Sequence, residues 1–219
     1  TFSSRGLGDV YKRQHIKYFK INKEKIYIGS PISTFNDELF EASKSYKYNT
    51  LPIKLGYFGV LTKGVRSPEN TLKFFKNSDF EFNWYTNPDS KLMVTQNKIN
   101  LDNHKFFDMV SRDEALDKMT SSLHCLLSIG NLNPGQLPSK IIEYISTGKP
   151  VIHFAEIDDD PVIQISKQFN NLIIVNTDSN LPELEDKLNK IFLNIDTFNK
   201  ETFIKNYSAG AITSNLDIL

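Results

Sequence analysis

Residues 130–150 read GNLNPGQLPSKIIEYISTGKP, and this segment decides the fold of the chain. An apolar strand is expected to end at Gly130, and a polar loop rich in Gly and Pro follows it. A short helix is expected to begin near Pro138 or Ser139 and to end at Gly148, directly before a second apolar strand. In an α/β sheet, anionic ligands bind where a loop leads from the carboxyl end of a strand into a helix. Glu143 lies one turn into this helix, within reach of a ligand hydroxyl.

Strands and helices alternate on both sides of this segment. Strands are expected at 55–61, 80–85, 106–110, 123–129, 151–154 and 172–175, with a shorter one at 92–95. Helices are expected from Pro68, from Ser111 (to about Met119), from about Pro161 and from about Pro182, with a helical tail over 197–218 that breaks near Gly210. The strand at 123–129 is apolar throughout, as strands buried on both faces of a parallel sheet are. The pattern predicts an α/β fold, a Rossmann-like doubly wound parallel sheet.

The composition excludes several classes of protein. The 219 residues carry 26 basic and 26 acidic side chains, which argues against nucleic acid as the main partner. No apolar run approaches the length of a membrane span, and no signal segment opens the chain. The single cysteine, Cys125, excludes an intramolecular disulfide, and the expected location is cytoplasmic.

The ends of the chain point to a fragment. Residues 1–14 resemble translated adapter read-through and are expected to be a non-native scar. Residues 15–50 have little periodicity and are expected to be the end of an N-terminal domain and an interdomain linker. Residues 51–219 are then expected to form one Rossmann-like domain, which holds the ligand loops described next.

Two loops carry basic residues at the ligand edge of the predicted sheet. The loop at 62–67 offers Lys63 and Arg66, and a guanidinium can grip a phosphate through two parallel hydrogen bonds. Taken alone, this loop is better explained as a solvated basic turn. The loop at 130–138 leads to the Ser139 hydroxyl and the mobile charge of Lys140, both expected to face an anion.

Residues 51–210 resemble the C-terminal, nucleotide-sugar-binding half of a GT-B glycosyltransferase of the group 1 type. The resemblance is carried by YFGVL at 57–61, by RSP at 66–68, and above all by GN at 130–131, QLPSKIIEY at 136–144 and TGKP at 147–150. The last group is fairly specific, whereas 57–61 alone would be weak.

The resemblance implies a role for each candidate residue. A glutamate in the position of Glu143 binds the donor ribose, and Lys63, Arg66, Ser139 and Lys140 are assigned to the diphosphate of a UDP- or GDP-sugar. Transfer would need no metal and no cofactor, because fixed positive groups stabilise the leaving diphosphate. The acceptor is not identified, no catalytic residue is assigned, and peripheral membrane association of the full-length enzyme is compatible with the resemblance.

The chain departs from the family in two ways. Many retaining members have a second glutamate eight positions before the ribose glutamate, and that position is Gly135 here. Its contact with the donor sugar must come from Asn131, Asn133 or Gln136, or be absent. The acceptor domain is also expected to be missing, so this fragment should bind a donor weakly and transfer nothing.

Two other functions stay open. A GT-B-fold epimerase acting on a UDP-sugar would need acid and base residues from the missing half. A binding protein that has lost transfer is slightly favoured by Gly135 and disfavoured by Glu143 and the basic loop at 62–67. Among weaker candidates, His124 and Cys125 are expected to be core residues, His153 either packs at a strand end or touches the nucleotide, and residues 158–160 are expected to cap a helix.

Overall fold

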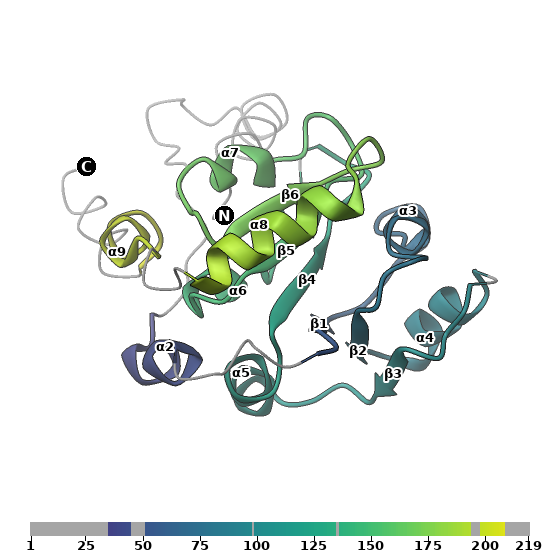
Figure 1. Cartoon of the computed structure of the whole chain (residues 1–219), viewed down its shortest axis with the longest axis horizontal. Helices are drawn as coiled ribbons and strands as arrows, with labels where there is room; N and C mark the ends of the chain where they lie inside the picture. Colours follow the sequence, from purple (N-terminus) through teal and green to yellow (C-terminus); the bar gives the residue numbers. More distant parts are fainter. Residues whose placement is uncertain (1–34, 45–50, 98, 135, 194–197, 209–219) are drawn as a thin grey trace, which may run out of the picture.

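The computed structural model describes residues 35–44, 51–97, 99–134, 136–193 and 198–208. Within these ranges six parallel strands form one sheet in the order β3-β2-β1-β4-β5-β6 (Figure 1). The strands are β1 Lys54–Phe58, β2 Glu81–Tyr85, β3 His104–Phe107, β4 Cys125–Ile129, β5 Val151–Phe154 and β6 Leu172–Val175. This confirms the predicted Rossmann-like doubly wound α/β fold.

The strand order reverses between β1 and β4. From β1 the chain builds outwards through β2 to β3, and it then returns to place β4 on the other side of β1. The register pairs of β1 and β4 are Leu55–Cys125 and Gly56–Leu126, at the amino ends of both strands. The strands therefore separate towards their carboxyl ends, and such a switch point is where open α/β sheets bind ligands.

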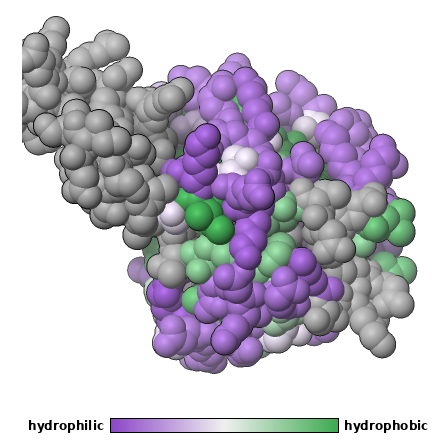
Figure 2. All heavy atoms as spheres, turned by 90° about the vertical axis from the view of Figure 1, so that its left-hand side faces the viewer, coloured by the Kyte–Doolittle hydropathy of each residue, from purple (hydrophilic) through white to green (hydrophobic). Residues whose placement is uncertain are grey.

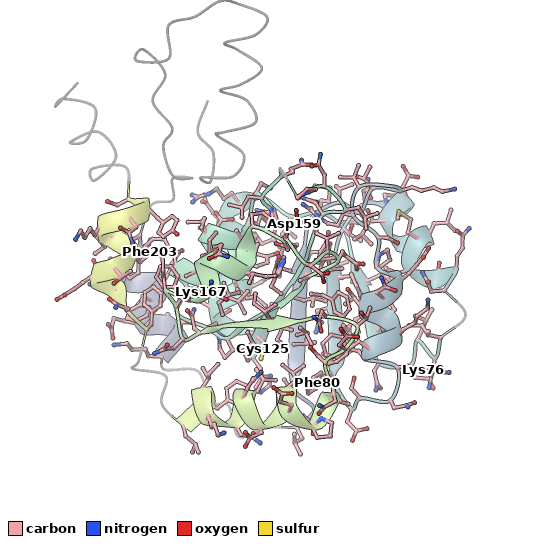
Figure 3. All side chains as sticks on the ribbon, turned by 90° about the horizontal axis from the view of Figure 1, so that it is seen from above. Lys76, Phe80, Cys125, Asp159, Lys167 and Phe203 are labelled. Atoms are coloured by element: carbon pink, nitrogen blue, oxygen red, sulfur yellow. The ribbon has the colours of Figure 1, made fainter. Side chains whose placement is uncertain are left out.

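Helices cover both faces of the sheet. One face carries α3 Glu69–Phe74, α4 Pro88–Thr95 and α8 Leu181–Leu193. The other carries α2 Asp37–Lys44, α5 Arg112–Ser121, α6 Ile141–Ser146, α7 Val162–Ser166 and α9 Lys200–Tyr207. Figure 3 shows α8 and α7 on opposite sides of the sheet. Strand β4 is buried along its whole length because it packs against both layers.

Helices α2 and α9 come from opposite ends of the described chain and meet over aromatic rings. Phe40 of α2 lies 5.3 Å from the ring of Phe198, and Phe198 lies 6.0 Å from Phe203 of α9. Figure 2 views this end of the molecule, whose described surface is mainly hydrophilic with a small apolar patch. The aromatic cluster therefore anchors both helices to the body of the domain.

Three expectations about local structure were wrong. Residues 92–95, expected as a short strand, lie in α4, because Pro88 starts that helix and the Asn87 side chain caps it by accepting from the Ser90 amide. The strand expected at 106–110 is β3, which begins and ends earlier. Pro68 is the residue before the first turn of α3, and it makes no side-chain cap.

The helix of the deciding segment is shorter than expected. Residues 139–140 form a turn, and α6 begins at Ile141. The segment ends as predicted at Gly148, whose φ of +72° few other residues adopt. A Cβ at this position would also overlap the ring of Phe40, so Gly148 allows α2 to pack closely.

Other helix ends agree with the sequence. Ser111 caps α5 by accepting from the Glu114 amide at 3.3 Å, and α5 continues to Ser121. The tail forms α9, and the break expected near Gly210 lies outside the described residues, as do residues 1–14. Of the expected linker 15–50, only 35–44 are described. None of the helices in the described ranges is long and apolar enough to cross a membrane.

Lys149 is a buried lysine between α6 and β5. Its side chain is fully buried, its ammonium donates to the carbonyl of Leu123, and burial lowers its pKa from 10.5 to about 7. The unfolded chain therefore binds a proton at this residue between pH 7 and 10.5 that the folded chain largely lacks. Stability should rise with pH across that window and fall as the pH is lowered through it.

This linkage can be measured against Lys149→Met. From pH 7 to pH 8 the free energy of unfolding of the wild-type chain should rise by about 1 kcal/mol relative to the variant. Urea unfolding of both chains at the two pH values measures the difference. If the difference in free energy of unfolding between the two chains is the same at both pH values, Lys149 has the same charge in the folded and the unfolded chain.

Candidate functional site

A cavity of about 270 Å³ lies at the switch point of the sheet. Its walls come from the carboxyl ends of β1 and β4, from the loop after β1, and from the turn and first residues of α6. The lining residues are Tyr57, Phe58, Gly59, Val60, Arg66, Leu127, Ser128, Ile129, Pro138, Ser139, Lys140 and Tyr144. The cavity thus joins the two loops that the sequence singled out.

Arg66 is held in the wall of this cavity by a tight turn. The amide of Arg66 donates to the carbonyl of Thr62 at 2.8 Å, and Gly64 lies between them with a φ of +76°. The half-buried side chain of Arg66 donates through Nε to Oδ1 of Asn131 at 3.1 Å. Because Nε is engaged, the terminal nitrogens of the guanidinium carry the donors available to a ligand.

Asn131 links the two loops. Its Nδ2 donates to the carbonyl of Gln136 at 2.9 Å, and the next residue, Leu132, donates its amide to the carbonyl of Val65 at 2.8 Å. Both groups of this buried amide therefore bind within the protein. Asn131 positions Arg66, and direct contact of Asn131 with a ligand stays a prediction.

Ser139 and Lys140 line the cavity from the other side. Ser139 is exposed and precedes α6 without capping it, because the helix begins later than expected. The Lys140 side chain is half-buried, and its Nζ lies 3.1 Å from Oε2 of Glu143. Lys140 and Arg66 therefore place two cationic side chains in the lining of the cavity.

Glu143 lies beside the cavity and does not line it. Its side chain is 14% exposed, and its carboxylate bridges Lys140 and Arg112, with Nε of Arg112 3.0 Å from Oε1. It lines a smaller cavity of about 70 Å³ between α2, α5 and α6, together with Arg112 and Ser146. A ligand that reached Glu143 from the larger cavity would compete with these ion pairs.

Arg112 is a residue that sequence reasoning missed. It is the first residue of α5, directly after the cap Ser111 at the carboxyl end of β3. The sequence predicts that Arg112 follows the helix cap Ser111. It does not predict the ion pair of Arg112 with Glu143 on α6, because that pair depends on how α5 and α6 pack on the sheet.

Three other candidates lie outside the cavity wall. Lys63 is at the exposed tip of the turn, and Asn133 and Gln136 are exposed in the loop after β4. Gly135, the position of the family's other glutamate, lies outside the described residues. Roles for Lys63 and Gln136 in binding a ligand stay predictions.

Tyr144 joins α6 to the end of β1. Its hydroxyl accepts from the amide of Phe58 at 3.0 Å and donates to the same residue's carbonyl at 3.1 Å. Burial raises the pKa of Tyr144, so the hydroxyl stays protonated. Burial also raises the pKa of Tyr57, although Arg66 opposes that rise. Both tyrosines therefore serve the cavity as neutral groups.

The weaker candidates are structural or belong to a second network. His124 is buried and accepts the amide of Lys54 at 3.0 Å, as a satisfied core residue does. Of residues 158–160, expected to cap a helix, Asp160 accepts the amide of Val162 at 2.9 Å, but the N-cap position of α7 is Pro161, which makes no side-chain cap. Among the described residues, no three His, Cys, Asp or Glu side chains are grouped to hold a metal ion.

Comparison with known proteins identifies the fold. No protein-family model and no curated protein sequence matches the chain. Among solved structures, it is similar to the lipopolysaccharide outer core galactosyltransferase WaaB in its apo form, with a TM-score of 0.61 and 12% identity over 99% of this chain and 60% of that one.

Two further similar structures contain ligands. Anabaena Alr3699/HepE in complex with UDP-glucose matches with a TM-score of 0.57 and 12% identity, over 100% of this chain and 63% of that one. The pneumococcal O-GlcNAc transferase GtfA in complex with UDP and GlcNAc matches with a TM-score of 0.54 and 14% identity, over 99% and 44%. The chain therefore has a GT-B glycosyltransferase-like fold, and it spans less than two thirds of the length of these proteins.

Proposed function

We propose that this chain is the donor-binding part of a glycosyltransferase and binds a nucleotide diphosphate sugar. The observation that carries the proposal is the cavity at the switch point, walled by Arg66 and Lys140, in a GT-B glycosyltransferase-like fold. An elongated anionic ligand placed there would meet cations from both loops.

The cationic walls suit the chemistry of sugar transfer. When the bond between the sugar and the diphosphate breaks, negative charge develops on the leaving diphosphate. The guanidinium of Arg66 and the ammonium of Lys140 would stabilise that charge without reorganising. In this proposal Glu143 accepts a hydrogen bond from a ribose hydroxyl, after its ion pairs with Arg112 and Lys140 have rearranged. The diphosphate is bound without a metal ion.

The acceptor and the second wall of a transfer site belong to a longer protein in this proposal. The similar structures named above are longer than this chain, so we expect donor binding here and transfer only in the full-length enzyme. A protein that binds nucleotide sugars without transfer is the second candidate, favoured by Gly135 in place of a glutamate.

Titration calorimetry of the 219-residue chain tests the proposal. UDP, GDP and their glucose esters are titrated in buffer with EDTA and again with Mg²⁺. We expect either the uridine compounds or the guanosine compounds to bind, with the same affinity in EDTA as in Mg²⁺. Binding of none of them contradicts the proposed function, and binding only with Mg²⁺ contradicts metal independence.

Transfer is tested with the full-length gene. Release or transfer of sugar by the full-length enzyme supports a transferase. Donor binding without release or transfer across a panel of donors supports the second candidate.

A further inference from the structure

A buried chain of hydrogen bonds runs from the cavity into the protein. Ser128, which lines the cavity, and His153 are register partners on β4 and β5, so their side chains share a face of the sheet. Oγ of Ser128 lies 3.0 Å from Nδ1 of His153, and Nε2 of His153 lies 3.0 Å from Oδ2 of Asp160. Ser128 is 4% exposed, His153 is not exposed at all, and Asp160 is 2% exposed.

Asp160 is fixed by two further features. Its other oxygen, Oδ1, accepts the amide of Val162 at the start of α7. Gly130, where the deciding segment begins, leaves room for it, because a Cβ at Gly130 would overlap Oδ2 of Asp160. The carboxylate therefore has one position, from which it faces the imidazole.

The direction of each hydrogen bond follows from this arrangement. An ionised carboxylate only accepts, so Nε2 of His153 carries a hydrogen. If the imidazole is neutral, Nδ1 accepts, and the hydroxyl of Ser128 must donate to it. If the imidazole is protonated, Nδ1 donates to the Ser128 oxygen, and the hydroxyl hydrogen is free to point into the cavity.

We infer that Ser128 is a ligand-binding residue of this cavity, and that His153 and Asp160 are positioning residues that turn its hydroxyl towards an anion. The inference rests on the proposed function, which places a diphosphate in the cavity. A phosphate oxygen accepts hydrogen bonds, so it favours the arrangement in which the Ser128 hydroxyl is free. Binding of the donor therefore takes up a proton on His153.

The charges around His153 act in both directions. Asp160, whose Oδ2 lies 3.0 Å from Nε2, favours the imidazolium. Asp160 in turn interacts with Glu156, whose pKa is raised chiefly by burial and also by Glu69 and Asp160, while a hydrogen bond from Asn70 opposes the rise. Arg66 and Lys140 line the same cavity as Ser128, and in this proposal their charges oppose the imidazolium until an anion neutralises them.

His153 shares its face of the sheet with neutral core side chains. Its register partner on β6 is Ile174, and α7 contributes Val162 and Ile165. The Tyr144 hydroxyl of α6 is bound to Phe58. An anion that offsets Arg66 and Lys140 therefore shifts the balance towards the imidazolium.

The same three residue types form the triad of serine hydrolases, but the arrangement here is reversed. In those enzymes the carboxylate holds Nδ1 and Nε2 faces the serine. Here Nε2 faces the carboxylate. Ser128 also lies within a strand and is almost fully buried, which suits a binding contact better than a nucleophile.

Proton uptake is measured by titration calorimetry with UDP-glucose and GDP-glucose. Their diphosphates are esterified at both ends, so the ligands themselves take up no proton near neutral pH. Each titration is run at pH 6, 7 and 8 in two buffers with different ionisation enthalpies. The difference between buffers gives the number of protons bound. We expect uptake by the wild-type chain and an affinity at least about threefold higher at pH 6 than at pH 8.

Variants separate this role from a structural one. Ser128→Ala should lower the affinity at pH 6 by about three- to tenfold and abolish proton uptake, and Ser128→Thr should restore both. Asp160→Asn should abolish the uptake, because a neutral amide no longer favours the imidazolium. Ser166→Ala on α7, which removes a hydroxyl bound to the carbonyl of Ile163, serves as the matched control.

The outcomes distinguish the two proposals. Binding of a nucleotide sugar without proton uptake, or with unchanged uptake in Asp160→Asn, overturns the inference and leaves the proposed function standing. Binding of neither ligand by the wild-type chain overturns both. Thermal unfolding of each variant identifies any variant that has failed to fold. If a variant does not fold, the two-buffer titration of the wild-type chain still shows whether donor binding takes up a proton.

Discussion

Arg66→Ala is expected to weaken binding of the preferred nucleoside diphosphate by about 10- to 100-fold, or about 1.4–2.7 kcal/mol. Arg66 is the lining residue whose charge is fixed in the cavity wall, by the Thr62 turn and by Asn131. In the proposed function, its removal costs the charge-assisted hydrogen bonds to the diphosphate. Titration calorimetry with UDP and GDP measures the loss.

Two further variants sharpen this result. Arg66→Lys keeps the charge but loses the paired donors, so it should recover only part of the affinity. Lys76→Ala removes an exposed charge that follows α3 and should leave the affinity unchanged. Figure 3 shows Lys76 well away from Asp159, which marks the edge of the sheet where the strands have their carboxyl ends. Equal effects of Arg66→Ala and Lys76→Ala would show that only the net charge matters. Lys63→Ala in the same assay tests the prediction for the exposed tip of the turn.

Glu143→Ala is expected to weaken donor binding, and to slow transfer by the full-length enzyme, by at least about tenfold, or about 1.4 kcal/mol. The reason is the loss of the carboxylate that, in the proposed function, accepts hydrogen bonds from the ribose hydroxyls. Comparison of UDP with 2′-deoxy-UDP and 3′-deoxy-UDP tests that reason directly. The wild-type chain should prefer UDP over at least one deoxy compound, and Glu143→Ala should lose that preference.

Arg112→Ala is the control for this variant. Glu143 ties α6 to α5 through Arg112, so its removal could act through packing alone. Arg112→Ala breaks the same ion pair and keeps the carboxylate. If it lowers UDP affinity as much as Glu143→Ala does, the effect is structural and the ribose assignment is wrong. Unchanged UDP affinity in Glu143→Ala would contradict the assignment outright.

The sequence predicted local structure well where one strong pattern acted alone. The apolar run at 123–129 contains β4, Ser111 caps α5, and Gly148 ends the segment that holds α6. Residues 92–95 show the opposite case. Their apolar, β-branched composition favours a strand, and the start of the helix at Pro88 overrides it.

The sequence by itself determined the alternation of strands and helices, and it singled out the two loops, with Arg66 and Lys140, that meet at the cavity. Hydrophobic periodicity, turn residues and caps act over a few neighbouring positions, so they can be read along the chain. The tertiary structure decided which distant side chains meet. It placed Glu143 against Arg112 and joined Ser128, His153 and Asp160 behind the cavity, because strand order and register bring these residues together and neither is encoded in local pattern.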